Sequence, residues 1–191
     1  MPLPSSGPLS LNDIQTEFGG TNPISLSEYY AGGGTGFVPA GTTGTFGAVP
    51  SSGTISIRNF YGTSKIVYRL DSGTYLDSTF SPLDAQTTIT VGTSGALGVS
   101  TFNSGVLASY NWLTPTATAS THFVRLTPTS GTFSGATTGV WLALTSDRAW
   151  FVNQTGVGFS SASGTLAIST NSGGTNIVAT ASITLQALVD I

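Results

Sequence analysis

A short motif occurs three times in the first third of the chain, and it constrains this region more than any other feature of the sequence. In each copy a serine occupies the position of a helix N-cap, and a side chain three residues later can reach back to the backbone of that cap. The pairs are Ser10 with Asp13, Ser25 with Glu28, and Ser56 with Asn59, the last being the weaker variant. The motif predicts three brief capped helical turns.

Each copy also carries an apolar pair that brackets its cap, in the spacing of a hydrophobic staple. The pairs are Leu9 with Ile14, Ile24 with Tyr29, and Ile55 with Phe60. A glycine follows each unit, at Gly19, Gly32 and Gly62, where a helix commonly ends. Turns this short are not stable alone, so their apolar sides must be buried either against the rest of this chain or against a neighbouring one.

The composition excludes several classes of partner. Charged residues make up 7% of the 191 residues, against about 25% in typical soluble domains, so the surface must consist largely of Ser, Thr, Gly, Asn and Gln. The five basic residues are scattered and the net charge is -3, so we expect no nucleic-acid partner. Cysteine is absent, which removes disulfides, thiolate metal sites and cysteine nucleophiles.

No apolar stretch approaches the roughly 20 residues of a transmembrane helix. The first residues, Met-Pro-Leu-Pro-Ser, lack the basic start and the long apolar stretch of a signal peptide. We therefore expect a soluble chain that does not insert into a membrane and is not exported by that route.

The chain is predicted to have two parts, residues 1–62 and residues 63–191. The first contains two glycine-rich stretches, residues 32–36 and 41–47, and glycine loses much backbone entropy when it is ordered. We expect this part to be an extended arm that becomes ordered when it docks onto a partner. The predicted docking residues are Leu9, Ile14, Phe18, Ile24, Tyr29, Tyr30, Ile55, Phe60 and Tyr61.

From about residue 63 the apolar residues recur with a period of two, which is typical of strands with one buried face. The clearest case is residues 177–189, where Ile183, Leu185 and Val189 share one face and Ser182, Thr184 and Gln186 share the other. Further strand candidates are residues 65–70, 87–91, 97–102, 106–113, 122–127, 140–145, 148–153 and 165–170. The pattern predicts an all-β fold, an antiparallel sandwich of jelly-roll or immunoglobulin-like type, with closure into a barrel as the competing arrangement.

Few residues suggest catalysis or metal binding. The single histidine, His122, lies in a strand pattern without carboxylates nearby in sequence, and no Gly-x-Ser-x-Gly motif is present. Asp71 and Asp77 could belong to a calcium loop, but we favour a hairpin turn around residues 72–74. We expect a protein that is not an enzyme and has no cofactor or metal.

The three tryptophans are the remaining candidates for ligand contacts. Trp112, Trp141 and Trp150 could form a platform for sugar rings, since aromatic faces stack on carbohydrate. Packing between sheets is the favoured interpretation of Trp141 and Trp150. Trp112, beside Pro115, is the residue chosen as a possible contact to a host-surface glycan.

The N-terminal residues resemble those of virion structural proteins of tailed bacteriophages, often described as tail fibre or tail proteins. The resemblance lies in residues 9–20, 22–30 and 53–62, and it includes the order of the motifs and the positions of the glycines. Residues 123–127, 130–132, 141–144, 150 and 181–185 are more loosely similar to β-rich modules of phage tail proteins. The resemblance implies a multimeric protein without catalytic activity, and a trimer is the expected homo-oligomer.

These observations together predict a non-enzymatic component of a phage virion, associated with the tail as a fibre or baseplate protein. Its N-terminal arm would dock onto other virion proteins, and copies of the chain would associate with one another. A capsid decoration or cement protein is the first alternative, and a carbohydrate-binding host adhesin is the second.

Overall fold

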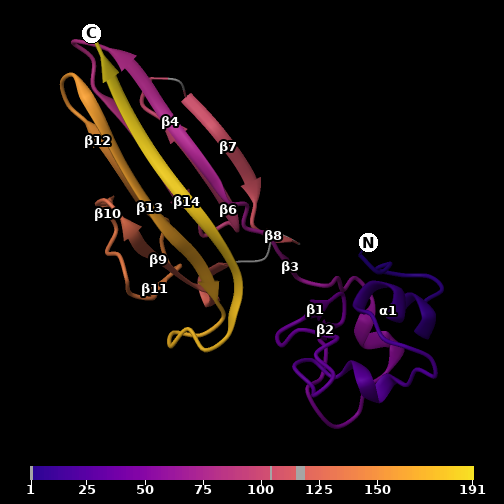
Figure 1. Ribbon diagram of the computed structural model, residues 1–191. Coiled ribbons are helices and arrows are strands. Elements are labelled where there is room, and N and C mark those ends of the chain that lie inside the picture. Colours follow the sequence, from indigo (N-terminus) through magenta and orange to yellow (C-terminus); the bar gives the residue numbers. More distant parts are fainter. Residues whose placement is uncertain (1, 104, 115–118) are drawn as a thin grey trace. The chain divides into compact units, whose positions relative to one another are not determined.

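Figure 1 shows the computed structural model, which describes residues 2–103, 105–114 and 119–191. The chain divides into two compact units, one ending at Val67 and the other formed by Tyr68–Ile191, so the boundary follows residue 67 and not residue 62. We describe each unit by itself and refer to them as the N-terminal unit and the sandwich unit. In the described part of the chain, no helix has the length and apolar character needed to cross a bilayer.

The N-terminal unit contains the three predicted helical turns. They are α1 (Leu11–Phe18), which is an α-helix, and the 3-10 helices η1 (Leu26–Tyr29) and η2 (Ile57–Phe60). The unit also contains the two-residue strands β1 (Thr43–Gly44) and β2 (Gly47–Ala48), which pair antiparallel.

The serine of each motif begins its helix as predicted. At α1 the Ser10 hydroxyl accepts a hydrogen bond from the Asp13 amide at 3.2 Å, and the Ser10 amide donates to the Asp13 carboxylate at 2.8 Å. The Ser25 amide donates in the same way to Glu28 at 3.0 Å. At the weaker copy the Ser56 amide donates to the Asn59 side chain at 2.8 Å. α1 ends at Gly19, whose φ of 94° favours glycine.

The second apolar residue of each staple lies in one shared core. Ile14, Tyr29 and Phe60 are fully buried, and Phe60 packs edge to face against Phe18 at 6.1 Å and against Tyr29 at 6.2 Å between ring centroids. The core consists of Leu3, Ile14, Phe18, Tyr29, Ala31, Val38, Val49 and Phe60. The three motifs, which are far apart in sequence, therefore close around a single apolar centre.

This core corrects the prediction of an extended arm. The chain returns on itself, because the Leu3 amide donates to the Thr63 carbonyl at 2.8 Å and the Gly62 amide donates to the Pro4 carbonyl at 2.9 Å. The extended arm was predicted from the entropy that glycines lose on ordering, and the sequence did not show whether the staples are buried in this chain or against another one. The structure places them inside their own chain, so the unit is folded without a partner.

The sandwich unit is built from two five-stranded sheets and a small two-stranded sheet. Sheet I has the strand order β10-β12-β5-β6-β7, sheet II has the order β11-β9-β13-β14-β4, and β3 pairs with β8. The bounds are β3 (Val67–Tyr68), β4 (Gly73–Phe80), β5 (Ala85–Val91), β6 (Ala96–Thr101), β7 (Gly105–Asn111), β8 (Leu113–Thr114), β9 (Phe123–Ser130), β10 (Ser134–Gly135), β11 (Leu142–Ala143), β12 (Arg148–Gln154), β13 (Gly158–Ser169) and β14 (Ile177–Asp190), with the 3-10 helix η3 (Ala119–Thr121) before β9.

The predicted all-β sandwich is confirmed, and the strand alternation explains its core. In β14 the residues Ile183, Leu185, Ala187 and Val189 are buried, while Thr184, Gln186 and Leu188 alternate with them and are partly exposed. Within the two five-stranded sheets all strand pairs are antiparallel except β4 with β14, which run parallel with Phe80 beside Asp190. Residues 65–70 and 140–145 contain only two-residue strands, whereas β13 begins seven residues before the predicted residue 165.

Candidate interaction surfaces

Four of the nine predicted docking residues are enclosed in the N-terminal core and cannot contact a partner. These are Ile14, Phe18, Tyr29 and Phe60, none of which is more than 1% exposed. The other five, Leu9, Ile24, Tyr30, Ile55 and Tyr61, are half-buried. Two of these five form internal hydrogen bonds, because the Tyr30 hydroxyl donates to the Gly53 carbonyl and the Tyr61 hydroxyl to the Gly7 carbonyl. The apolar anchors therefore stabilise the unit itself, which corrects their predicted role.

The N-terminal unit presents an aromatic groove on its surface. The groove has a volume of about 520 Å³ and is lined by Ser5, Ser6, Gly7, Phe46, Ile57, Arg58 and Tyr61. Phe46 is 49% exposed and stands edge to face against Tyr61 at 5.9 Å. The Arg58 guanidinium lies 4.4 Å from the centre of the Phe46 ring, a cation–π arrangement. Phenylalanine, tyrosine and arginine are among the residue types enriched in protein interfaces.

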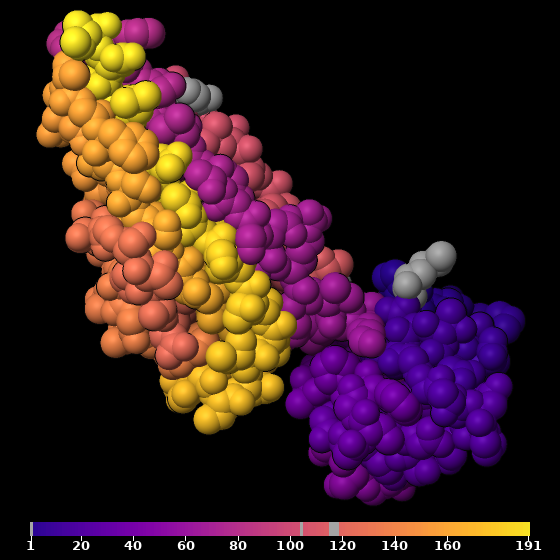
Figure 2. All heavy atoms as spheres, in the orientation of Figure 1, coloured from indigo at the N-terminus to yellow at the C-terminus, as the bar shows by residue number. Residues whose placement is uncertain are grey.

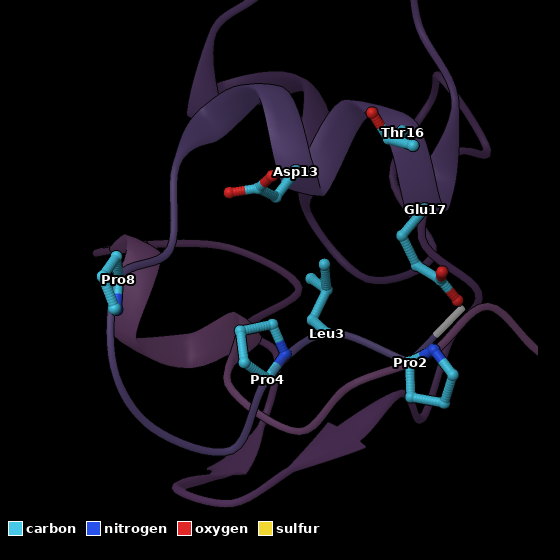
Figure 3. Close-up of a pocket in the computed structure, with 7 residues that line it drawn as sticks. All are labelled: Pro2, Leu3, Pro4, Pro8, Asp13, Thr16 and Glu17. Carbon is cyan, nitrogen blue, oxygen red and sulfur yellow. The ribbon is translucent and has the colours of Figure 1, made fainter.

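A second pocket of this unit has a different chemistry (Figure 3). Its volume is about 300 Å³, and three proline rings face one side of α1 across it. Its lining residues are Pro2, Leu3, Pro4, Pro8, Asp13, Thr16 and Glu17. The Ser10 hydroxyl and then the Ser10 amide lower the pKa of Asp13 by hydrogen bonding, and Glu17 accepts from the Lys65 amide at 2.8 Å. Both carboxylates thus hold the local fold together.

Trp112 is fully buried in the sandwich unit, so its predicted contact with a surface glycan is wrong. Its ring is stacked on Tyr68 at 6.3 Å and meets His122 edge-on at 5.5 Å. The Tyr68 hydroxyl and the His122 Nε2 atom share a hydrogen bond of 2.9 Å. Three residues distant in sequence therefore form an enclosed aromatic cluster, which explains why the tryptophan is inaccessible.

His122 lies directly before β9 with its ring in this cluster. Burial lowers its pKa, and an interaction of the ring with the Ala119 backbone partly opposes that effect. The ring is therefore held in its neutral form around neutral pH. Among the described residues, no three His, Asp or Glu side chains gather closely enough to hold a metal ion.

The two aspartates considered for a calcium loop have separate environments. Asp71 pairs with Arg69, whose Nε lies 3.0 Å from the Asp71 carboxylate. Asp77 is buried in the middle of β4, where its carboxylate accepts from the Gln86 amide at 2.9 Å and from the Asn103 side chain at 3.0 Å. The favoured hairpin around residues 72–74 is also wrong, because Gly73–Phe80 forms a single strand.

Asp77 instead connects the two sheets. Its amide donates to the Thr87 hydroxyl on β5 at 2.9 Å, and that hydroxyl donates to the Gln186 carbonyl on β14 at 2.6 Å. One oxygen of the Asp77 carboxylate is buried without a hydrogen-bond partner among the described residues. Buried polar groups of this kind are costly to disturb, so this side chain is a structural anchor of the sandwich.

Exposed apolar side chains gather at one end of the sandwich unit, which we call the tip. There β4 and β14 end together, β13 begins beside the end of β14, and β12 ends beside the start of β5. In Figures 1 and 2 this is the end at which magenta β4 and yellow β14 both finish. The tip residues are Phe80, Leu83, Phe102, Val106, Val157 and Phe159.

These side chains are unusually open to solvent. Phe102 is 73% exposed, Val106 72% and Phe80 68%. Beside Phe102 lies a recess of about 170 Å³, lined by Asp84, Ala85, Gln86, Phe102, Asn153 and Thr155. A cluster of exposed large apolar residues marks an interaction site more often than single scattered ones do.

The exposed charged side chains of the described tip are carboxylates. Asp84 and Asp190 lie there and are exposed. The arginines of the sandwich unit lie elsewhere: Arg69 precedes β4 and pairs with Asp71, Arg148 pairs with Val91 at the far end of β5, and the Arg125 guanidinium stacks on Trp141. The tip is therefore an apolar surface with an acidic border.

The sequence interpretation missed both the groove and the tip, although it contained a signal for the tip. Large apolar residues stand in or beside the turns Phe80–Leu83, Phe102–Asn103 and Val157–Phe159, where polar residues are usual. The groove had no comparable signal, because Phe46 lies in a glycine-rich stretch far in sequence from Arg58 and Tyr61. No family model, curated protein or solved structure matches the chain.

Proposed function

We propose that this chain is a non-enzymatic structural protein of a tailed-phage virion, associated with the tail as a fibre or baseplate component. The resemblance of the three N-terminal motifs to phage tail proteins suggests the type of particle. The observation that carries the proposal is the exposed groove of Phe46, Arg58 and Tyr61 on a unit that is already folded. Such a surface suits attachment to another protein.

Docking by a folded unit differs from docking by an arm. An arm must lose backbone entropy when it binds, whereas the N-terminal unit has fixed its turns around its own core before it meets a partner. The interface between this unit and its partner can therefore be small in area. Repetition of a weak contact in a homo-oligomer raises the overall affinity through effective concentration.

The test is to locate the protein in particles of the phage that encodes it. Purified heads and purified tails would be probed with an antibody against the full chain, by immunogold labelling and by quantitative mass spectrometry. We expect the protein on tails at a fixed number of copies. Detection on heads alone would identify a decoration protein, and absence from intact particles would refute the virion role.

Variants test whether the groove performs the attachment. Arg58→Glu combined with Phe46→Ser should greatly reduce incorporation, because the cation and the exposed ring of the groove are both lost. The matched control is Val140→Ser, which changes another exposed apolar residue, 47% exposed, outside both the groove and the tip. Normal incorporation of the groove variant would show that attachment uses another surface.

A further inference from the structure

We propose that copies of this chain associate head to tail, with the tip of one copy seated in the groove of the next copy. The proposal goes beyond a role in a virion, since it rests on two surfaces of the chain and can be tested with the purified protein. The partner is a second copy because the two surfaces are complementary: the tip has protruding apolar side chains and carboxylates, and the groove has an apolar recess and a cation.

The tip supplies protruding apolar side chains. Phe102 and Val106 stand at the turn between β6 and β7, and both are more than 70% exposed. Phe80 and Leu83 flank the neighbouring turn, where the Leu83 amide donates to the Phe80 carbonyl at 3.1 Å. The bond fixes this turn, so Phe80 and Leu83 can enter a recess without much further loss of conformational entropy.

The groove supplies a recess of suitable chemistry. Its volume of about 520 Å³ exceeds that of a single aromatic side chain, and its walls are the Phe46 and Tyr61 rings with Ile57. The 5.9 Å edge-to-face contact between Phe46 and Tyr61 leaves Phe46 half exposed, so an additional ring can pack beside it.

The charges of the two surfaces are complementary. Arg58 lines the groove and has no ion pair with any carboxylate of the described chain, whereas Arg69 is paired with Asp71. Asp84 lines the recess at the tip and likewise has no cationic partner among the described residues. Contact of the two surfaces places an unpaired cation against an unpaired carboxylate, in a chain with 7% charged residues.

Neither surface is complementary to itself. Two tips in contact would bring Asp84 and Asp190 of one copy against the same carboxylates of the other, and two grooves would bring two Arg58 guanidinium groups together. Like charges facing each other disfavour both symmetric arrangements. A contact between two different surfaces is heterologous, so it continues from copy to copy into a filament, whose terminal groove stays free for another virion protein, or closes into a ring.

The experiment measures the molar mass of the full-length protein by sedimentation velocity from micromolar to millimolar concentration. The wild-type mass should rise with concentration, and rise less in high salt because Arg58 and Asp84 are screened. A tip variant, Asp84→Arg with Phe102→Ser, and a groove variant, Arg58→Glu with Phe46→Ser, should each raise the dissociation constant at least about tenfold. Val140→Ser should leave association unchanged.

Mixing the variants identifies the geometry. The tip variant keeps an intact groove and the groove variant keeps an intact tip, so an equimolar mixture should form one-to-one dimers and nothing larger. A chain carrying Asp84→Arg together with Arg58→Asp should regain association, because the charges are exchanged between the surfaces. Circular dichroism should show that each variant is folded, because the substituted side chains are exposed.

Three results would overturn the proposal. The first is a wild-type protein that remains monomeric at millimolar concentration. The second is a symmetric dimer that the tip variant abolishes and the mixture does not restore, which indicates contact between two tips. The third is association that neither variant weakens. All three are independent of where the protein lies in a particle, so they leave the virion proposal to its own test.

Discussion

The two units of this chain are held together by contacts of different sequence range. In the N-terminal unit most polar contacts that define the turns join residues close in sequence, such as Ser10 with Asp13 and Ser25 with Glu28. In the sandwich unit the decisive contacts are distant, as between the Thr87 hydroxyl and the Gln186 carbonyl, 99 residues apart. A local motif can thus set the elements of a small unit, whereas a sandwich depends on strand pairing across the whole sequence.

The two units also differ in what they bury. The N-terminal unit has one small core, closed by three aromatic rings and a few aliphatic residues. The sandwich unit has two sheets of alternating strands and encloses polar groups such as Asp77, Thr87 and His122. Removal of a single core ring should therefore destabilise the N-terminal unit most, whereas the sandwich unit should be destabilised by loss of a buried hydrogen bond.

The largest effect should follow removal of Phe60, the ring that contacts both Phe18 and Tyr29. Phe60→Ala should destabilise the N-terminal unit by about 3–5 kcal/mol while the unfolding transition of the sandwich unit is preserved. Calorimetry, with hydrogen exchange read separately for residues 2–67 and 68–191, measures this. The control Phe46→Ala removes a half-exposed ring that contacts Tyr61 and Arg58, and should cost only about 1 kcal/mol. Simultaneous unfolding of both units would break the contrast.

A moderate effect is expected at Asp77, whose carboxylate holds Gln86 and Asn103. Asp77→Ala leaves these donors without their acceptor, so the sandwich unit should lose about 1–3 kcal/mol in denaturant unfolding. The control Asp84→Ala removes an exposed carboxylate nearby and should have little effect. Equal losses of unfolding free energy in the two variants would show that the buried hydrogen bonds of Asp77 do not contribute to the stability of the sandwich unit.

A smaller effect is expected at the first cap. Ser10→Ala removes the hydroxyl that accepts from the Asp13 amide and should cost the N-terminal unit about 1 kcal/mol. At the weaker copy the Ser56 hydroxyl donates to Asn59, so Ser56→Ala should cost less. Thermal melting of both variants measures the difference, with Ser6→Ala as an exposed control. A larger loss at Ser56 would contradict the ranking of the motifs.

The smallest effect is a pH dependence confined to the sandwich unit, which holds the single histidine. Burial lowers the pKa of His122 in the folded state below its ordinary value of 6.5, so the unfolded chain binds more protons below that pH. The free energy of unfolding should be constant well above pH 6.5 and fall as the pH drops through 6.5 toward the lowered pKa of the folded state. Melting curves of wild type and His122→Gln check this, since the variant should lack that part of the slope. An identical slope in both proteins would exclude His122 as the cause.

The sequence alone was sufficient for the features that depend on near neighbours. The cap at Ser10 and the alternation in residues 177–189 follow from contacts within a few residues or from the period of a strand, so both were predicted and are confirmed. The sandwich class follows from the same alternation. β4 was missed because Asp77 and Gly73 are typical of turns, and its strand is stabilised by distant Thr87 and by β14.

The tertiary structure decided where each apolar side chain is buried. The staples showed that Ile14, Tyr29 and Phe60 need a covering surface, but the sequence did not show that they cover one another. Likewise Trp112 is enclosed because Tyr68 and His122 reach it from other parts of the chain. Burial depends on contacts between residues distant in sequence, and periodicity records only which side of an element is apolar. For this reason the arm became a folded unit, and the surfaces that remain exposed could be identified only in the structure.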